Sequence, residues 1–202
     1  MKNMYLLSGC NGAGKTTAAY YILPDILQCK EFVNADEIAK GLSPFQPETV
    51  TYEAGKILSL RINSLIEKGE TFAVETTLSA LTYKNKIAYA QENGYVVSLI
   101  YFWLSSTELA KQRVKLRVEE GGHNISEQVI TRRYYRGLNN FFEIFLSICD
   151  NIMLFDNSDN SPKLIMAKVK NKEPEIYNEQ IYNQIRNSYV RKRNSKSESC
   201  NS

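Results

Sequence analysis

The sequence is poor in the residues that build metal centres and disulfide frameworks. It holds one histidine and four cysteines in 202 residues. The cysteines (Cys10, Cys29, Cys149 and Cys200) form no C-x-x-C pair and no other metal-ligand spacing. We therefore expect reduced thiols in a cytoplasmic protein, and we expect the single histidine, His123, to serve as a structural hydrogen bonder.

Long apolar runs are also missing. No stretch approaches the roughly 20 apolar residues that span a bilayer. The apolar start, 4–7, is too short for a signal peptide and runs directly into a glycine loop. We therefore expect no membrane segment, and the composition, with 43% apolar and 23% charged residues, is typical of a soluble globular domain.

The formal net charge of +3 is unevenly distributed. Lysine and arginine gather in residues 111–136 and 186–202, while the rest of the chain is mildly acidic. Two local basic clusters on an acidic body favour a specific anion site over general nucleic-acid affinity.

Apolar, strand-like segments alternate with helix-like segments along the chain, a pattern that predicts an α/β fold with a mainly parallel sheet covered by helices on both faces. Strands are expected at 4–7, 31–34, 71–75, 95–104 and 151–155, with a last edge strand at 164–169; helices are expected at 15–27, 48–68, 81–93, 107–120 and 126–148. Residues 1–170 then form one domain. Residues 171–202 form a polar C-terminal helix, around 174–189, and a basic, disordered tail.

A complete phosphate-binding loop (P-loop) follows the first expected strand and opens the first expected helix. The motif G-x-x-x-x-G-K-[ST] is matched by Gly9, Cys10, Asn11, Gly12, Ala13, Gly14, Lys15 and Thr16, and Thr17 follows it. Its glycines let successive backbone N–H groups point at phosphate oxygens, and the helix adds its positive N-terminal end. Lys15 is expected to reach the β- and γ-phosphates of ATP, and the Thr16 hydroxyl to ligate Mg²⁺.

The P-loop alone does not separate a kinase from a GTPase or a motor. The guanine-specific motif N-K-x-D is absent, and no long apolar strand ends in aspartate. Instead the expected strand 71–75 ends in Glu75, which places a carboxylate at the carboxyl end of the sheet, where open α/β folds bind ligands. Glu75 would hold a magnesium-bound water or a substrate hydroxyl; the alternative is a solvated glutamate at the end of a strand.

Asp36 follows the end of another expected strand, across the loop from the phosphate site. A carboxylate there can orient an acceptor hydroxyl and take its proton during phosphoryl transfer. The alternative is that Asp36 only caps the helical turn 37–41. Glu37 is expected to point away from the site.

Arginines line two expected helices joined by the Gly121-Gly122 turn. Arg113 and Arg117 share one helical face, and Arg132, Arg133 and Arg136 lie on the second helix. Such a pair of helices can form a lid that closes on ATP phosphates and stabilises the charge of the transferred group. The alternative is a solvated basic face.

These motifs resemble the zeta-toxin family of P-loop kinases. The resemblance rests on four stretches in order: 9–17, 32–44 (FVNADEIAKGLSP), 72–79 (FAVETTLS) and 113–136 (RVKLRVEEGGHNISEQVITRRYYR). It implies a P-loop kinase-like three-layer sandwich with a five-stranded parallel sheet and the arginine lid at about 113–136.

The resemblance also implies an activity and roles for individual residues. The activity is Mg²⁺- and ATP-dependent phosphorylation of a hydroxyl on a small sugar nucleotide such as UDP-N-acetylglucosamine, in a protein that an antitoxin can bind. Catalysis would use Lys15, Asp36 as the acceptor base, and Arg117 and Arg132 as phosphate clamps; Arg113 would join the ATP site, and Glu75 and Thr77 the acceptor pocket. The other function compatible with the residues is a nucleotide-binding switch whose basic lid and tail engage RNA or a protein.

Overall fold

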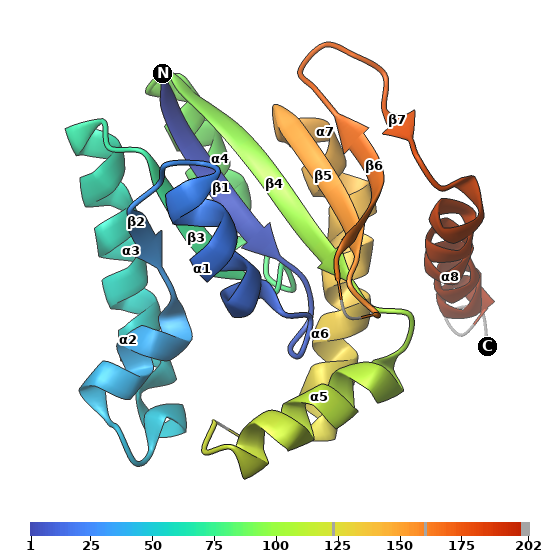
Figure 1. The fold of residues 1–202 in the computed structure, drawn as a ribbon, viewed down its shortest axis with the longest axis horizontal. Helices are drawn as coiled ribbons and strands as arrows, with labels where there is room; N and C mark the ends of the chain where they lie inside the picture. Colours follow the sequence, from blue (N-terminus) through green and yellow to red (C-terminus); the bar gives the residue numbers. More distant parts are fainter. Residues whose placement is uncertain (123, 160, 199–202) are drawn as a thin grey trace.

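The computed structural model describes residues 1–122, 124–159 and 161–198. Within these residues a seven-stranded sheet has the order β2-β3-β1-β4-β5-β6-β7 (Figure 1). The strands are β1 (Lys2–Ser8), β2 (Glu31–Val33), β3 (Phe72–Thr76), β4 (Tyr95–Trp103), β5 (Asn151–Asp156), β6 (Lys163–Lys168) and β7 (Glu175–Ile176). The strands β2, β3, β1, β4 and β5 run parallel, and β6 and β7 add antiparallel pairs at one edge.

The parallel part of the sheet confirms the expected α/β architecture. β1 is the middle one of the five parallel strands, with Ser8 at its carboxyl end level with Thr76 of β3 and Tyr101 of β4. The prediction that residues 164–169 form the last edge strand was wrong, because β7 pairs with the outer side of β6. A two-residue strand has no alternation that a sequence pattern could reveal.

Helices cover both faces of this sheet, as Figure 1 shows, with α1 over one face and α4, α6 and α7 behind the other. Their bounds are α1 (Lys15–Asp25), α2 (Ala35–Leu42), η1 (Pro47–Val50), α3 (Thr51–Lys68), α4 (Thr82–Glu92), α5 (Thr107–Glu119), α6 (Glu127–Asn140), η2 (Phe141–Phe145), α7 (Leu146–Ile148) and α8 (Glu179–Glu198). In the described part of the chain, no helix is long and apolar enough to cross a membrane.

Two helical segments differ from expectation. The helix expected at 126–148 contains a π-helical turn, η2, whose Phe141 and Phe145 are fully buried. Helix α8 starts later than the expected 174 and continues to Glu198, through part of the stretch expected to be disordered; residues 199–202 lie outside the described residues. His123 also lies outside them.

The helices α5 and α6 of the expected lid are anchored at the ends nearest the sheet. In α5, Ala110 and Val114 are buried, and in α6 the Tyr134 hydroxyl donates a 2.6 Å hydrogen bond to the carbonyl of Leu104. The positive φ of 88° at Gly121 marks the turn where α5 ends. Both helices are therefore packed against the sheet through part of their length.

Candidate active site

The P-loop lies between β1 and α1 and is held open by two close backbone approaches. A Cβ at Gly9 would stand 2.3 Å from the Phe102 carbonyl oxygen, and one at Gly12 would stand 2.6 Å from that of Ala110. Both residues also have positive φ, of 140° and 80°, a region that side chains avoid. Glycine is therefore required at both positions if the loop is to pack against β4 and α5.

Helix α1 begins beyond Gly14, which offers no side chain to cap the first turn. Its first N–H groups are thus left for an anionic ligand. The loop is fixed from outside by Asn157, whose Nδ2 donates a 2.8 Å hydrogen bond to the carbonyl of Ala13. Within the loop, burial raises the pKa of the Cys10 thiol to about 11, so this cysteine stays protonated and contributes its backbone.

Three polar side chains converge on the carboxylate of Glu75 at the end of β3. The Thr16 hydroxyl donates to Oε2 over 2.6 Å and Asn34 Nδ2 donates to the same oxygen over 2.9 Å. Lys15 Nζ lies 3.5 Å from Oε1 and donates a 2.9 Å hydrogen bond to the Cys10 carbonyl. The structure thus brings Glu75 of β3 to Lys15 and Thr16 of the P-loop, a motif that the sequence placed in a separate segment.

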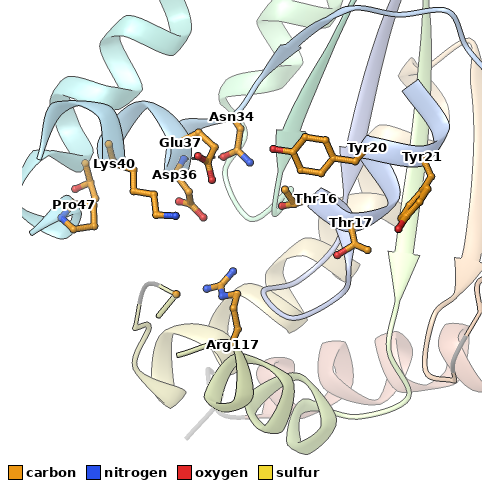
Figure 2. A pocket seen from close by; sticks show the side chains of 13 residues that line it. Thr16, Thr17, Tyr20, Tyr21, Asn34, Asp36, Glu37, Lys40, Pro47 and Arg117 are labelled. Carbon is orange, nitrogen blue, oxygen red and sulfur yellow. Dashed lines mark hydrogen bonds between the residues drawn. The ribbon is translucent and has the colours of Figure 1, made fainter. Parts of the chain in front are cut away.

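Asp36 keeps its carboxylate available because another residue caps α2. Asn34 is the N-cap, and its Oδ1 accepts a 2.8 Å hydrogen bond from the Asp36 backbone N–H. The side chain of Asp36 is exposed and points into the space below α2 (Figure 2). Glu37 lines the same space, contrary to the expectation that it points away.

Two adjoining cavities are lined by the described residues around the P-loop. The larger, of about 760 Å³, runs from the P-loop between α1 and α5 to the β5–β6 loop, and we call it the P-loop cavity. The smaller, of about 400 Å³, lies under α2, and we call it the α2 cavity. The residues that line both are Thr16, Thr17, Tyr21, Asp36 and Arg117. The cavities therefore meet where the P-loop threonines face Asp36.

The arginines of α5 have different environments. Arg117 lines both cavities and extends from α5 toward the space beneath Asp36 and Lys40 (Figure 2). Arg113 lines the P-loop cavity, and its guanidinium donates to the carbonyls of Asn157 and Ser158 over 2.7 and 2.9 Å. Arg113 thus fastens α5 to the β5–β6 loop at the far end of the P-loop cavity.

On α6, Arg133 rather than Arg132 faces the P-loop. Arg133 Nη1 donates to Asn11 Oδ1 over 3.2 Å. Burial lowers the pKa of the Arg133 guanidinium, the Asp36 carboxylate opposes that shift, and neighbouring Arg132 reinforces it, so Arg133 lies within the electrostatic reach of Asp36. The side chain of Arg132 is exposed, whereas that of Arg133 is half-buried, and neither is among the described residues that line the two cavities.

Thr77 is also not among the described residues that line the two cavities. Its hydroxyl shares a 2.8 Å hydrogen bond with that of Ser79, and its carbonyl packs against Gly137 of α6. The β3–α4 loop is also bound to α6 by Asn140, whose Nδ2 donates to the Leu78 carbonyl over 2.8 Å. Thr77 therefore connects the end of β3 to α6.

Sequence reasoning missed Asn34 and Asn157 and assigned no individual role to Arg133. Asn34 and Asn157 each follow a strand at the carboxyl edge of the parallel sheet, so the topological rule that selected Glu75 could have selected them as well. The choice between Arg132 and Arg133 had no such signal, because it depends on the rotation of α6 about its axis.

Comparison with known proteins agrees with this geometry. The family model described as Zeta toxin matches residues 1–179. The chain belongs to the zeta toxin family. Another relative is an uncharacterized protein of Haemophilus influenzae, 32% identical over 126 residues, which cover 62% of this chain and 88% of the relative.

Solved structures show that this zeta toxin family chain has a P-loop kinase-like fold. The structure of the AvrRxo1-ORF1:AvrRxo1-ORF2 complex with sulphate ions contains a chain that is 19% identical to this one, with a TM-score of 0.75. The match covers 92% of this chain and 63% of the AvrRxo1 chain. The structure of the same complex with ATP has a TM-score of 0.74. The PezAT toxin–antitoxin system of Streptococcus pneumoniae matches 86% of this chain and 74% of its own, at 19% identity and a TM-score of 0.67. The chain thus spans less than two thirds of the AvrRxo1 chain that it matches.

Proposed function

We propose that the protein is a kinase that transfers the γ-phosphoryl group of ATP to a hydroxyl group of a small metabolite. The observation that carries the proposal is the junction of the two cavities at Thr16, Asp36 and Arg117. In-line transfer requires a donor and an acceptor on opposite sides of the moving phosphoryl group. The P-loop cavity would hold the donor, and the α2 cavity the acceptor.

The donor site is supported by the P-loop and its neighbours. Backbone N–H groups of 9–17 and the Lys15 ammonium would bind the phosphates, because they are donors at the start of α1, which no side chain caps. The rest of the nucleotide would extend toward Arg113 and Asn157 at the other end of the cavity. The related AvrRxo1 complex has been solved with ATP, which supports the same donor here.

The residues present fit a magnesium ion. Mg²⁺ prefers oxygen ligands and is held by few protein groups besides phosphates and water, and Thr16 and Glu75 bring a hydroxyl and a carboxylate together. Within the described residues, no three His, Cys, Asp or Glu side chains form a group that could hold a metal ion by themselves. Thr16 would ligate Mg²⁺ directly and Glu75 would hold its water; the ion would neutralise charge on the phosphates.

On the acceptor side, Asp36 would accept a hydrogen bond from the attacking hydroxyl and take its proton as the new P–O bond forms and ADP departs. Arg117 and Arg133 would neutralise charge on the moving phosphoryl group. This assignment replaces Arg132, which is exposed, by Arg133, which contacts the P-loop. Glu75 would remain part of the site, because it accepts a hydrogen bond from Thr16. Thr77 would contribute only by packing the β3–α4 loop against α6.

The α2 cavity is lined by Lys40, Tyr20 and Tyr21 as well as by acids. A cation and aromatic rings suit an acceptor that carries an anionic group and a planar ring. A UDP-N-acetyl sugar has these features and is the acceptor that the family resemblance implies. Because PezAT and the AvrRxo1 complex are two-component assemblies, we include an antitoxin-like protein partner in the proposal.

The acceptor is tested by incubating the protein with ATP, Mg²⁺ and UDP-N-acetylglucosamine and measuring product mass. We expect the sugar nucleotide to gain one phosphate while ADP accumulates in equal amount. Asp36→Asn is the matched control, because it keeps side-chain size and removes the proton acceptor. If the sugar nucleotide remains unchanged, that acceptor is wrong, and a panel of hydroxylated metabolites replaces it.

A further inference from the structure

Glu75 holds both P-loop side chains that a nucleotide would need. Its Oε1 is paired with the Lys15 ammonium at 3.5 Å, and its Oε2 accepts from the Thr16 hydroxyl at 2.6 Å. Oε2 also accepts from Asn34 Nδ2 at 2.9 Å. One carboxylate therefore pairs with the Lys15 ammonium that the proposed function assigns to the phosphates, while the Thr16 oxygen keeps its lone pairs for Mg²⁺.

This arrangement is enclosed and held by the sheet. The side chains of Lys15 and Glu75 are only 6% and 11% exposed. Glu75 belongs to β3, where it lies level with Leu7 of β1, and its backbone is therefore fixed by the sheet. A buried carboxylate keeps its charge only while it is paired and hydrogen-bonded. Glu75 thus remains beside the P-loop and needs the Lys15 ammonium that the phosphates of a ligand would take from it.

We propose that Glu75 acts as an internal competitor of the nucleotide phosphates and so makes the site select Mg²⁺-bound ATP over metal-free ATP. This inference rests on the proposed function, since it concerns the same donor site. Metal-free ATP must draw Lys15 away from Glu75 and place its phosphates beside a fixed negative charge. Like charges a few ångströms apart in a poorly solvated site repel strongly.

A divalent ion reverses the sign of this interaction. Mg²⁺ on the phosphates gives Glu75 a positive partner, directly or through a bound water, and releases Lys15 for the phosphates. The Thr16 oxygen can ligate the ion through a lone pair while its hydrogen still donates to the carboxylate. Glu75 is in this sense a selectivity residue for the charge state of the nucleotide, in addition to any role in catalysis.

The test is calorimetric binding of ATP in excess Mg²⁺ and in excess EDTA, for the wild-type chain and for Glu75→Gln. Glutamine keeps the size and can still accept from Thr16, but it removes the charge. We expect wild type to prefer Mg²⁺-bound ATP by about tenfold or more, as loss of roughly 1.4 kcal/mol of repulsion implies. We expect Glu75→Gln to bind metal-free ATP about tenfold more tightly and to bind Mg²⁺-bound ATP no more tightly than wild type.

Glu92→Gln is the control, because Glu92 is an exposed glutamate at the end of α4, is not among the described residues that line either cavity, and loses the same charge. We expect it to retain the wild-type preference within about threefold, a difference of under 1 kcal/mol. A second variant, Glu75→Asp, retains the charge and should retain the preference, so the inference stays testable if Glu75→Gln fails to give a cooperative thermal transition.

The outcomes separate the inference from the proposed function. If wild type binds neither form of ATP, the proposed function is wrong. If wild type binds both forms equally, or if Glu75→Gln keeps the preference for Mg²⁺-bound ATP, the function stands and the role of Glu75 as a competitor is wrong. Loss of the preference in Glu75→Asp would also contradict an effect of charge.

Discussion

Arg133 of α6 donates a hydrogen bond to Asn11 of the P-loop over 3.2 Å. The two residues are 122 positions apart in the sequence, and the contact joins the second lid helix to the loop that would hold the phosphates. Arg133 is also within the electrostatic reach of Asp36, so one guanidinium contacts the P-loop and interacts with the proposed acceptor base.

This placement predicts unequal roles for two adjacent arginines. Arg133→Gln should lower the rate of phosphoryl transfer by about 10²–10³-fold, the usual effect of removing one preorganised charge contact. Arg132→Gln, at an exposed position, should change the rate by less than about threefold, since it removes no such contact. Steady-state kinetics on both variants measure the two transfer rates. Equal loss of rate in the two variants would contradict a specific role for Arg133 in transfer.

Asp36→Asn should separate transfer from nucleotide binding. We expect transfer to fall by about 10²–10⁴-fold, the range for a positioned base, with ATP affinity nearly unchanged because the P-loop contacts are intact. Glu37→Gln is the comparison, since Glu37 lines the α2 cavity and is not a described lining residue of the P-loop cavity. A loss of ATP affinity in Asp36→Asn as large as the loss of transfer would make Asp36 a nucleotide ligand instead.

Gly137 allows α6 to approach the β3–α4 loop. A Cβ at this position would stand 2.5 Å from the Thr77 carbonyl oxygen, so Gly137→Ala should force a backbone shift and lower the unfolding free energy by about 1–3 kcal/mol. The control is Gly41→Ala in α2, where an added Cβ meets nothing within 4 Å; it should be neutral or stabilising by up to about 1 kcal/mol. Denaturant unfolding measures both, and a Gly137→Ala chain as stable as wild type would contradict the close packing.

Asp150, buried at the other end of the sheet from the site, should control stability in acid. Burial alone would raise the pKa of its carboxyl. Hydrogen bonds from Lys170, the Val97 N–H and Gln91 together outweigh burial, so the pKa is lowered. Because the folded-state pKa is depressed, the stabilisation is present above the unfolded value of about 3.9. It is lost as the pH falls below that value through the folded pKa.

We therefore expect Asp150→Asn to be less stable than wild type at pH 7 by about 1.5–3 kcal/mol, as for other hydrogen bonds to charged groups. The gap between the two chains should close as the pH falls below about 4. Thermal melts over pH 3–7 measure it, with the exposed Asp25→Asn as control. A gap that stays constant with pH would show that packing, rather than charge, accounts for the loss.

The sequence predicted well wherever a local pattern carries the information. The full P-loop motif gave the position of Lys15 and Thr16, and strand ends gave Glu75 and Asp36, because the carboxyl ends of parallel strands meet at one edge of the sheet. The buried strand β4 was found within one residue of its end, since nine consecutive residues with little polarity leave few alternatives.

Features that depend on tertiary packing could not be predicted in this way. The side of α6 that faces the P-loop depends on how Tyr134 and Leu138 pack, so the choice between Arg132 and Arg133 lay beyond the sequence pattern. The contact of Asn157 with the P-loop joins segments 144 positions apart. The expectation that Glu37 points away was also wrong. The α2 cavity extends along α2 beyond Asp36, so that Glu37 lines it as well.

The fate of the γ-phosphate is the most direct test of the proposed kinase. The protein is incubated with γ-labelled ATP, Mg²⁺ and a small-molecule extract, and the label is followed to inorganic phosphate or to an organic product. We expect the label in an organic molecule that carries a free hydroxyl, and we expect Lys15→Ala to lower that labelling by about 10²-fold or more. Label found only in inorganic phosphate, or labelling that survives Lys15→Ala within about threefold, would contradict phosphoryl transfer at this P-loop.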